Sequence, residues 1–437
     1  MKYYLAIDLG ATSGRHFIGY LENDQIKLVE LYRFKTEMDA SPNGLVWDID
    51  RIYQEIKNGI KKAFEKYPKI ESISIDTWGV DYVLMDNDKE IIPYYAYRNA
   101  RCEESSAKLH KVIDFKDLYK RTGIQYAPFN TIYQLYDDLN KNRLDKATDY
   151  LMLPSYFTYK LTGIKTHEYT NESTTSLINP KTMDYDYELI DKIGLPRKLF
   201  SEIKKPGEFI GELKEEVQKE VNGNTKVILC ASHDTASAFE AVDVKDNSVI
   251  ISSGTWSLLG IKTKEAIITN DSFEANYTNE GGVGYIRFLK NIMGMYLANH
   301  LKEETNLSFD DINKLIVKSN YKETFDVNDK SLNAPISMRQ ALLELLKDNP
   351  PKDDIDLFAS IYHSLALSYK KAIKELERIT NIKFERIYII GGGAKSTYLN
   401  NLVKEYTKID VISMPIEATS LGNILVQMKG NNYEKRS

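Results

Sequence analysis

The sequence has few cysteines, no long apolar run and no excess of positive charge. Cys102 and Cys230 lie far apart and form no C-x-x-C pattern, which argues against a disulfide framework or zinc site and fits a reducing compartment. No apolar run approaches the ~20 residues that a bilayer crossing needs. Asp8 interrupts the apolar N-terminal stretch, unlike a signal peptide. We therefore expect a cytoplasmic protein with no membrane partner.

The charge balance and length narrow the class further. The 437 residues include 58 Lys and Arg against 63 Asp and Glu, a net charge of −5, so nucleic acid is not an expected partner. The hydrophobic fraction of 42%, with 30 Tyr and 15 Phe, argues against disorder. This length predicts two or three domains. A multi-domain globular enzyme is the expected class.

Hydrophobic periodicity in the first half predicts an α/β sheet. Three strands are expected at 3–7, 16–20 and 26–34. Apolar residues at spacings of three and four predict a helix over 49–64, and an apolar run predicts a buried strand over 70–75. Strand, helix and strand in this order indicate a parallel crossover.

The second half opens in a similar way. An apolar run at 248–251 meets a small-residue turn at 252–255 and continues at 256–261, which suggests a duplicated architecture. The polar stretch 243–247 between the halves is typical of a domain boundary or hinge. Further on, the pattern predicts a long amphipathic helix over 357–373, a strand over 386–390 and a helix from about Thr397.

Three small-residue turns are candidate phosphate or nucleotide sites. The stretch 8–15 (DLGATSGR) could direct backbone N–H groups and Arg15 at phosphate oxygens, with Asp8 on a hydrated Mg²⁺. The hydroxyl-rich turn 252–257 could do the same in the second half, and Gly391–Gly393 would let a ring or phosphate lie against bare backbone. The alternative at each place is an ordinary turn, and neither a P-loop nor a dinucleotide fingerprint is present.

Two further segments are candidates for substrate chemistry. Asp234, in the stretch 231–238 (ASHDTASA), follows an expected strand at 226–230 and lies near a helix start, where an ionised carboxylate is favoured. It could accept a proton from a sugar hydroxyl, and the alternative is a helix N-cap. Thr77–Asp81 and Ala96–Arg101 carry the aromatic and polar groups that a polyhydroxylated ligand needs, or simply pack.

Together these segments resemble the FGGY carbohydrate kinase family over essentially the whole chain. The stretches that carry the resemblance are AIDLGATSGR (6–15), SIDTWGVDYVLMD (74–86), RTGIQYAPFNTIYQL (121–135), EYTNESTT (168–175), SHDTASA (232–238), SSGTWSLLG (252–260), TNEGG (278–282), LKNIMG (289–294), IIGGGA (389–394) and EATSLGN (417–423). TWGVD combined with NIMG and SHDTASA is most similar to the members that phosphorylate L-rhamnulose.

The resemblance implies an α/β, actin-like (ribonuclease H-like) fold with two related domains and a cleft between them. Residues 1–242 would bind the sugar and supply the first phosphate turn, residues 243–430 would bind the nucleotide, and 431–437 would be a tail. The family transfers the γ-phosphoryl group of ATP, with Mg²⁺, to a sugar hydroxyl; the implied acceptor is the 1-hydroxyl of L-rhamnulose.

The resemblance also implies roles for individual residues. Asp234 matches the proton-accepting aspartate. The implied sugar contacts are Gly79, His233, Asp234, Thr235 and Asn291, the implied ATP contacts are Ala11, Thr12, Ser13, Gly14, Arg15, Thr255, Asn299 and Gly392, and Asp8 would hold the metal through water. Asn299 stands where the family has Gln, and Asn99 stands where related kinases carry Asp.

Three other functions fit parts of the pattern. A kinase for another ketose, such as L-fuculose or L-xylulose, would share these motifs. A non-catalytic, actin-like ATP-driven clamp would share the fold but would not need the sugar-binding segments TWGVD and SHDT. A regulatory sugar sensor would not need both phosphate turns.

Overall fold

The computed structural model describes residues 1–244, 247–414 and 417–433, which form two compact units. The first unit combines Met1–Ala241 and Lys262–Phe288 with the described residues from Thr419 onward. The second contains the described residues of Val242–Ile261 and Leu289–Ala418. The predicted hinge at 243–247 includes residues 245 and 246, which lie outside the described residues.

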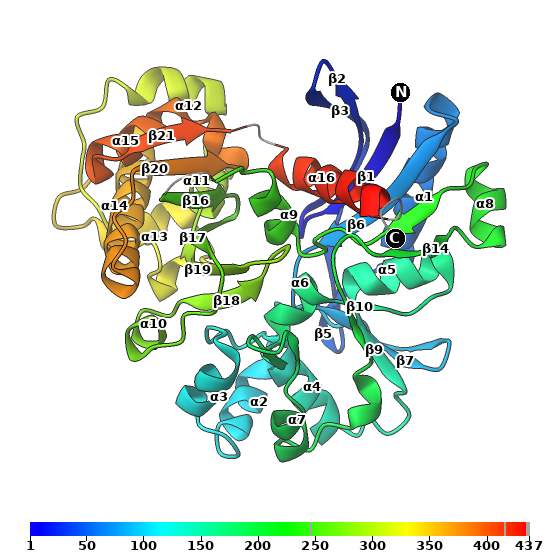
Figure 1. Cartoon of the computed structure of the whole chain (residues 1–437). Helices are drawn as coiled ribbons and strands as arrows, with labels where there is room; N and C mark the ends of the chain where they lie inside the picture. Colours follow the sequence, from blue (N-terminus) through cyan, green and yellow to red (C-terminus); the bar gives the residue numbers. More distant parts are fainter. Residues whose placement is uncertain (245–246, 415–416, 434–437) are drawn as a thin grey trace. The chain divides into compact units, whose positions relative to one another are not determined.

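The sheet of the first unit has six strands in the order β14-β15-β6-β1-β2-β3 (Figure 1). Its strands are β1 (Tyr3–Leu9), β2 (Ser13–Glu22), β3 (Gln25–Lys35), β6 (Ile70–Thr77), β14 (Phe209–Glu212) and β15 (Lys226–Ile228). The hairpin β1-β2 is antiparallel and the pair β1-β6 is parallel, so the predicted crossover is confirmed. The crossover runs through α1 (Ile49–Lys66).

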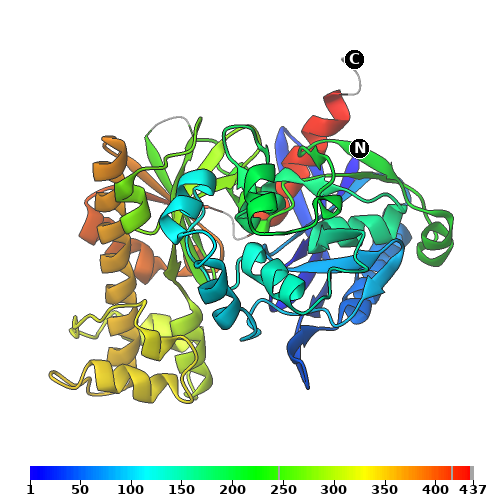
Figure 2. The same cartoon turned by 90° about the horizontal axis from the view of Figure 1, so that it is seen from below.

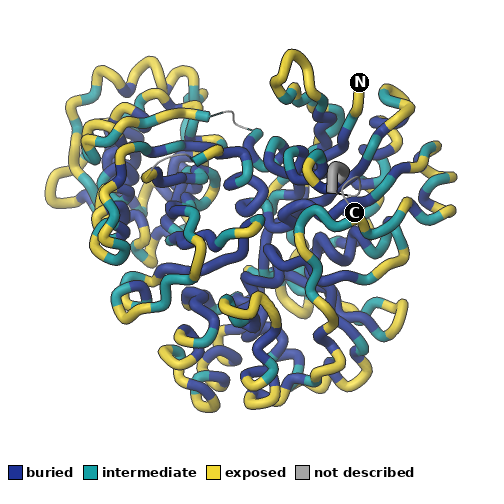
Figure 3. Tube along the Cα trace, in the orientation of Figure 1, coloured by how far each residue is buried: buried dark blue, intermediate teal, exposed yellow. Residues whose placement is uncertain are grey.

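Helix α1 forms as its sequence pattern predicts. The Asp48 side chain accepts a hydrogen bond from the Arg51 N–H and caps the first turn. Ile52, Ile56 and Ile60 fall on one face and are fully buried with the strands of the sheet. Figure 3 shows the same division, with dark blue along the strands and yellow at the loops.

The first unit also contains a second core beside the sheet, built around β7, β9 and α4. Outside the two large sheets, the strands of the first unit are β4 (Met38–Ser41), β5 (Gly44–Trp47), β7 (Tyr82–Asp86), β8 (Lys89–Ile91), β9 (Asp149–Met152), β10 (His167–Glu168), β11 (Ile178–Asn179), β12 (Asp184–Tyr185) and β13 (Ile203–Lys204). Its further helices are α2 (Cys102–Leu109), α3 (Phe115–Thr122), α4 (Thr131–Asn140), α5 (Leu153–Thr162), α6 (Tyr169–Glu172), α7 (Tyr187–Lys192), α8 (Glu215–Val221), α9 (Asp234–Glu240) and α10 (Asn270–Glu274).

The second large sheet repeats the topology of the first. Its order is β18-β19-β17-β16-β20-β21, with β18 (Thr278–Gly281), β19 (Ile286–Met293), β17 (Trp256–Thr263), β16 (Ser248–Ser253), β20 (Arg386–Ile390) and β21 (Asp410–Ser413). As in the first sheet, an antiparallel hairpin (β16-β17) is followed by a parallel neighbour (β20), which confirms the predicted duplication.

Helices complete the second unit. They are α11 (Tyr296–Glu303), α12 (Phe309–Ile316), α13 (Met338–Leu345), α14 (Asp354–Thr380) and α15 (Thr397–Thr407). The long α14 contains the helix predicted over 357–373, and α15 begins at the predicted Thr397.

The last helix, α16 (Ala418–Tyr433), packs on the sheet of the first unit, beside β1 and β6 (Figure 2). The Gln427 amide donates to the Leu5 carbonyl at 3.0 Å and accepts from the Ser72 hydroxyl at 2.7 Å. At Gly422 a Cβ would lie 1.7 Å from the Ser237 carbonyl oxygen, so only glycine permits this approach. Of the predicted tail 431–437, residues 434–437 lie outside the described residues.

A membrane-spanning helix would have to be long and almost uniformly apolar. None of the helices in the described ranges meets both conditions.

Candidate active site

The first predicted phosphate turn joins β1 to β2 at Gly10–Thr12. The Gly10 N–H donates to the Ser13 carbonyl at 2.9 Å, and the Thr36 hydroxyl donates to the Gly10 carbonyl at 2.6 Å. Gly14 is needed for packing, because a Cβ there would lie 2.3 Å from the Phe34 ring. The turn is therefore held in one shape by the sheet beneath it.

Two carboxylates stand close to this turn. Asp8 accepts an ion-paired hydrogen bond from Arg15 at 2.7 Å. Asp76 occupies the paired position on β6, is fully buried, and accepts from the Asn423 amide at 2.5 Å. Burial, together with the nearby charges of Asp8 and Asp234, raises the pKa of Asp76 well above its usual value. A cation at this end of β1 and β6 would relieve that repulsion.

The turn after β6 carries Gly79 and is fixed by Asp81. The Asp81 carboxylate is fully buried and accepts from the indole N–H groups of Trp47 at 2.7 Å and Trp78 at 2.9 Å. Burial raises the pKa of Asp81 to about 6, although these bonds oppose the rise. Val80 has a φ of 70°, an uncommon value for a β-branched residue. The turn around Gly79 is thus shaped by a dedicated set of contacts.

Asp234 is the first residue of α9, and the N-cap is His233. The N-cap alternative for Asp234 is therefore wrong by one position. Its Oδ1 accepts from the N–H of Thr235 at 2.5 Å and from the Thr235 hydroxyl at 3.1 Å. The Asp234 side chain keeps 30% of its surface exposed, so a ligand can reach it.

The Gly79 turn and the start of α9 are tied together. The Thr77 N–H donates to the Ser232 carbonyl at 2.9 Å. The Asn171 amide on α6 lies between the two segments, 3.3 Å from the Ser232 carbonyl and 3.5 Å from that of Trp78. Glu168 caps α6 and also accepts from the Ser232 N–H at 3.1 Å. The structure thus places Gly79, His233, Asp234 and Thr235 in one region of the first unit.

The second predicted phosphate turn, at Gly254 and Thr255, lies in the second unit between β16 and β17. The carbonyl of Gly254 accepts from the Met295 N–H at 2.8 Å, and that of Thr255 accepts from the Gly294 N–H at 3.1 Å. These bonds join the turn to the start of α11, which carries Asn299. The Thr255 and Asn299 residues are both exposed.

The glycine run 391–393 lies at the same end of this sheet, since β16 and β20 are parallel and Ser252 pairs with Ile390. Gly391 has a φ of 82°, and a Cβ at Gly393 would lie 2.0 Å from the Ser253 hydroxyl oxygen. At Gly392 the nearest atom to a Cβ would be 3.9 Å away. Packing explains the outer two glycines but not Gly392, which fits close approach of a ligand to the backbone.

Asn291 and Asn99 have different environments. Asn291 lies on β19 in the second unit, and its Oδ1 is buried without a hydrogen-bond partner among the described residues. The Asn99 amide donates to the carbonyls of Asn43 and Leu45 at 2.9 Å each, so it fastens a loop. An aspartate could not donate these bonds, which accounts for the departure from the family pattern at this position.

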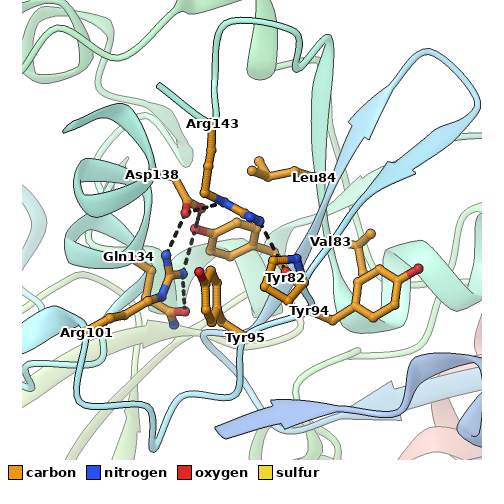
Figure 4. A pocket seen from close by; sticks show the side chains of 10 residues that line it. Tyr82, Val83, Leu84, Tyr94, Tyr95, Arg101, Gln134, Asp138 and Arg143 are labelled. Atoms are coloured by element: carbon orange, nitrogen blue, oxygen red, sulfur yellow. Dashed lines mark hydrogen bonds and ion pairs between the residues drawn. The ribbon is translucent and has the colours of Figure 1, made fainter. Parts of the chain in front are cut away.

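A buried cluster beside the Gly79 turn contains Arg101, Arg143 and Asp138 (Figure 4). Both guanidinium groups pair with Asp138, at 2.6 and 2.9 Å, and both lie over the Tyr95 ring. The cavity here has a volume of about 10 Å³, room for one water at most. The ion pairs of the cluster hold α4 against the segments that carry Arg101 and Arg143. The cavity itself is too small for a sugar.

The second unit contains a cavity of about 380 Å³ between β19, α14 and residues 324–328. Its walls include the ion pair of Lys290 with Glu375 at 2.7 Å, and they do not include Thr255, Asn299 or Gly392. The predicted nucleotide contacts therefore lie elsewhere in this unit.

Sequence patterns missed two buried charged residues next to the predicted site. Asp76 continues the apolar strand that was expected to end at residue 75, and Arg287 stands inside the apolar run of β19. Both are fully buried. A charged residue inside an otherwise apolar strand is the signal that could have found them.

Comparison with known proteins gives the family. The N-terminal domain of the FGGY family of carbohydrate kinases matches residues 3–239, and its C-terminal domain matches residues 249–430. The chain belongs to the FGGY family of carbohydrate kinases. It is therefore a sugar kinase, and ATP is the substrate that this family implies.

Individual relatives cover nearly the whole FGGY chain. The rhamnulokinase of Oceanobacillus iheyensis is 41% identical, over 97% of this chain and 92% of the relative. The rhamnulokinase of Bacillus subtilis is 37% identical, over 97% and 90%. The ligand-bound xylulose kinase of Lactobacillus acidophilus superposes with a TM-score of 0.82 at 19% identity, over 99% of this chain and 90% of the other. Plasmodium falciparum glycerol kinase with ADP gives 0.77 at 15%, over 99% and 90%. These structures confirm the expected two-domain, actin-like α/β fold.

Proposed function

We propose that the protein transfers the γ-phosphoryl group of ATP to the 1-hydroxyl of L-rhamnulose, giving L-rhamnulose 1-phosphate and ADP. The relatives named rhamnulokinase match over nearly full length, which supports this substrate. The observation that carries the proposal is the link between the Gly79 turn and the start of α9, because it brings the partly exposed Asp234 carboxylate close to the turn that carries Gly79, a proposed sugar contact.

In this scheme Asp234 is the proton acceptor. The sugar O1 attacks the γ-phosphorus in line, the O1–H proton passes to Asp234, and the bond from the γ-phosphorus to the bridging oxygen breaks to release ADP. Gly79, His233, Thr235 and Asn291 would contact the sugar. The buried, unpartnered Oδ1 of Asn291 supports a polar ligand there.

The nucleotide would be bound by the small-residue turns. Ala11, Thr12, Ser13, Gly14 and Arg15 would contact its phosphates through backbone N–H groups and the guanidinium. In the second unit, Thr255 would bind phosphate while Gly392 and Asn299 would contact the adenosine. Residues 1–242 would then serve the sugar and first phosphate turn, and residues 243–430 the nucleotide.

The residues near the first turn fit a magnesium ion. The Asp76 Oδ1 is buried without a hydrogen-bond partner among the described residues, and burial together with the neighbouring Asp8 raises the pKa of Asp76. Mg²⁺ prefers few carboxylates and several waters, so Asp8 would hold it through water. When bound, the ion would neutralise charge on the β- and γ-phosphates.

The two unpaired cysteines support a cytoplasmic location.

A coupled ADP-release assay over ketoses tests the function. We expect kcat/KM to be highest for L-rhamnulose, compared with L-fuculose and L-xylulose, with little ADP release in the absence of sugar. Preference for another ketose would reassign the substrate within the kinase family. ATP consumption that is independent of every sugar would favour the ATP-driven clamp instead.

A further inference from the structure

Arg287 is a buried cation that contacts His233, the residue next to the proposed proton acceptor Asp234. Its side chain is fully buried on β19. The Nε group donates to the Gly281 carbonyl at 2.8 Å, and Nη2 lies 3.0 Å from the Nδ1 of His233. A buried charge is costly unless it is paired and hydrogen-bonded, so the groups that contact this guanidinium are the ones to consider.

The contact with Arg287 defines the protonation of His233. A guanidinium group only donates hydrogen bonds, so Nδ1 of His233 must accept and carry no proton. The proton of the neutral imidazole is then on Nε2. This nitrogen lies 3.4 Å from the Oδ1 of Asp234. The Nε2–H group therefore lies close to the carboxylate that would receive the sugar proton.

Glu280 balances the charge and competes for the same nitrogen. Its Oε2 lies 3.1 Å from Nη2 of Arg287 and 3.4 Å from Nδ1 of His233. Burial opposes its ionisation, but the Arg287 guanidinium holds the pKa of Glu280 below its usual value. Without Arg287, the Glu280 carboxylate would attract a proton to Nδ1. The shorter contact, from Arg287, keeps that proton away.

The contacts of Asp234 leave one oxygen for the substrate. The N–H and hydroxyl of Thr235 and the Nε2 of His233 all meet Oδ1. Among residues in the described ranges, Oδ2 has no hydrogen-bond partner. A carboxylate fixed through Oδ1 presents Oδ2 in one orientation, which favours in-line proton transfer from a bound alcohol.

We propose that Arg287 and Glu280 are positioning residues of phosphoryl transfer, which set the tautomer of His233 and through it orient Asp234. This inference rests on the proposed function of Asp234. It gives a role to the TNEGG stretch (278–282), which contains Glu280 and which the proposed contacts with sugar and nucleotide do not use.

The protonation state of His233 is tested by NMR of the full chain labelled with ¹⁵N-histidine. We expect the wild-type protein at pH 7.5 to show the neutral Nε2–H tautomer at His233, assigned by its absence in His233→Asn. In Arg287→Met, a proton should appear on Nδ1. A wild-type imidazolium or an Nδ1–H tautomer would overturn the proposal. This readout needs no substrate, so it is independent of which sugar is phosphorylated.

Kinetics test the consequence for catalysis. With L-rhamnulose, Arg287→Met should lower kcat by at least ~10-fold while the KM for ATP stays within about 2-fold. The control Arg121→Met removes an arginine from an ion pair with Asp186 in the same unit and should leave both constants unchanged. Equal losses in the two variants would overturn the proposal. Inactivity of the wild type on L-rhamnulose would count against the proposed function instead.

A second pair of variants keeps the test valid if Arg287→Met does not fold. The amide nitrogen of His233→Gln can occupy the place of Nε2 and donate to Asp234, whereas that of His233→Asn occupies the place of Nδ1. We expect His233→Gln to retain at least ~10-fold more kcat than His233→Asn. Equal kcat values with a raised sugar KM in both would mean that His233 only contacts the sugar, and would overturn the positioning role.

Discussion

Asp8 and Asp76 occupy paired register positions on the parallel strands β1 and β6, so two carboxylates lie side by side at one end of the sheet. Burial and the neighbouring Asp8 raise the pKa of Asp76, which means that its ionised form destabilises the fold. Because of this group, the free energy of unfolding of the wild-type protein should fall as the pH rises above the pKa of an aspartate in the unfolded chain, about 4.

The variant Asp76→Asn removes this charge and can still accept from the Asn423 amide. We expect the melting temperature of the variant minus that of the wild type to be higher at pH 8 than at pH 5. Differential scanning calorimetry without Mg²⁺ measures this difference. A difference of the same size at both pH values would show that Asp76 is already ionised in the folded protein at pH 5, so that its pKa is not raised.

Asp234→Asn should lower kcat at least ~10²-fold and leave ATP affinity nearly unchanged, because the amide keeps the shape of the carboxylate but cannot accept the sugar proton. A kinase assay and a calorimetric ATP titration measure the two quantities. Turnover close to that of the wild type would remove Asp234 from the proton-acceptor role.

Thr255→Val should weaken ATP binding more than sugar binding, since the hydroxyl stands on the exposed turn between β16 and β17 and its backbone contacts with α11 would remain. Isothermal titration calorimetry with each ligand gives the comparison. A larger effect on the sugar would place the phosphate contact elsewhere.

Gly392→Ala and Gly393→Ala form a matched pair on one turn. A Cβ at Gly392 meets nothing closer than 3.9 Å, whereas at Gly393 it would lie 2.0 Å from the Ser253 hydroxyl oxygen. We expect Gly392→Ala to keep its melting temperature but bind ATP more weakly, and Gly393→Ala to lose stability. Unchanged ATP affinity in Gly392→Ala would argue against contact with the nucleotide at this position.

His167 predicts a pH dependence of stability. It is fully buried, and although burial disfavours its charge, the carboxylates of Glu172 at 2.9 Å and Asp149 at 3.1 Å raise its pKa to about 9. A histidine with a raised pKa contributes stability below its unfolded pKa of about 6.5 and loses that contribution as the pH rises through 9.

The stability advantage of the wild type over His167→Gln should therefore shrink by roughly 3 kcal/mol between pH 6 and pH 10, measured by urea unfolding. The half-buried His110, whose pKa is lowered chiefly by burial, gives the control His110→Gln, for which no such loss is expected above pH 6.5. An advantage over His167→Gln that does not depend on pH would mean that His167 is neutral in the folded protein.

Local patterns predicted the elements that carry the site, because hairpins and amphipathic helices leave short-range signals. The strands of both hairpins, α1, and the turns at Gly10 and Thr255 lie where the sequence placed them. Contacts between distant segments had no such signal. The bond from Thr77 to Ser232 and the contact of Arg287 with His233 join residues that only the folded sheet brings together. The strand expected to end at Cys230 ends at Ile228.

Helix α16 has a consequence for how this protein is made. The side chains of Gln427 and Asn423 form hydrogen bonds with buried groups of Leu5, Ser72 and Asp76. These three residues are synthesised hundreds of residues earlier. During synthesis, one face of the N-terminal sheet therefore stays uncovered until the last helix leaves the ribosome. A nascent chain stalled before residue 418 would thus expose an unfinished core, and that is the stage at which we expect chaperones to engage it.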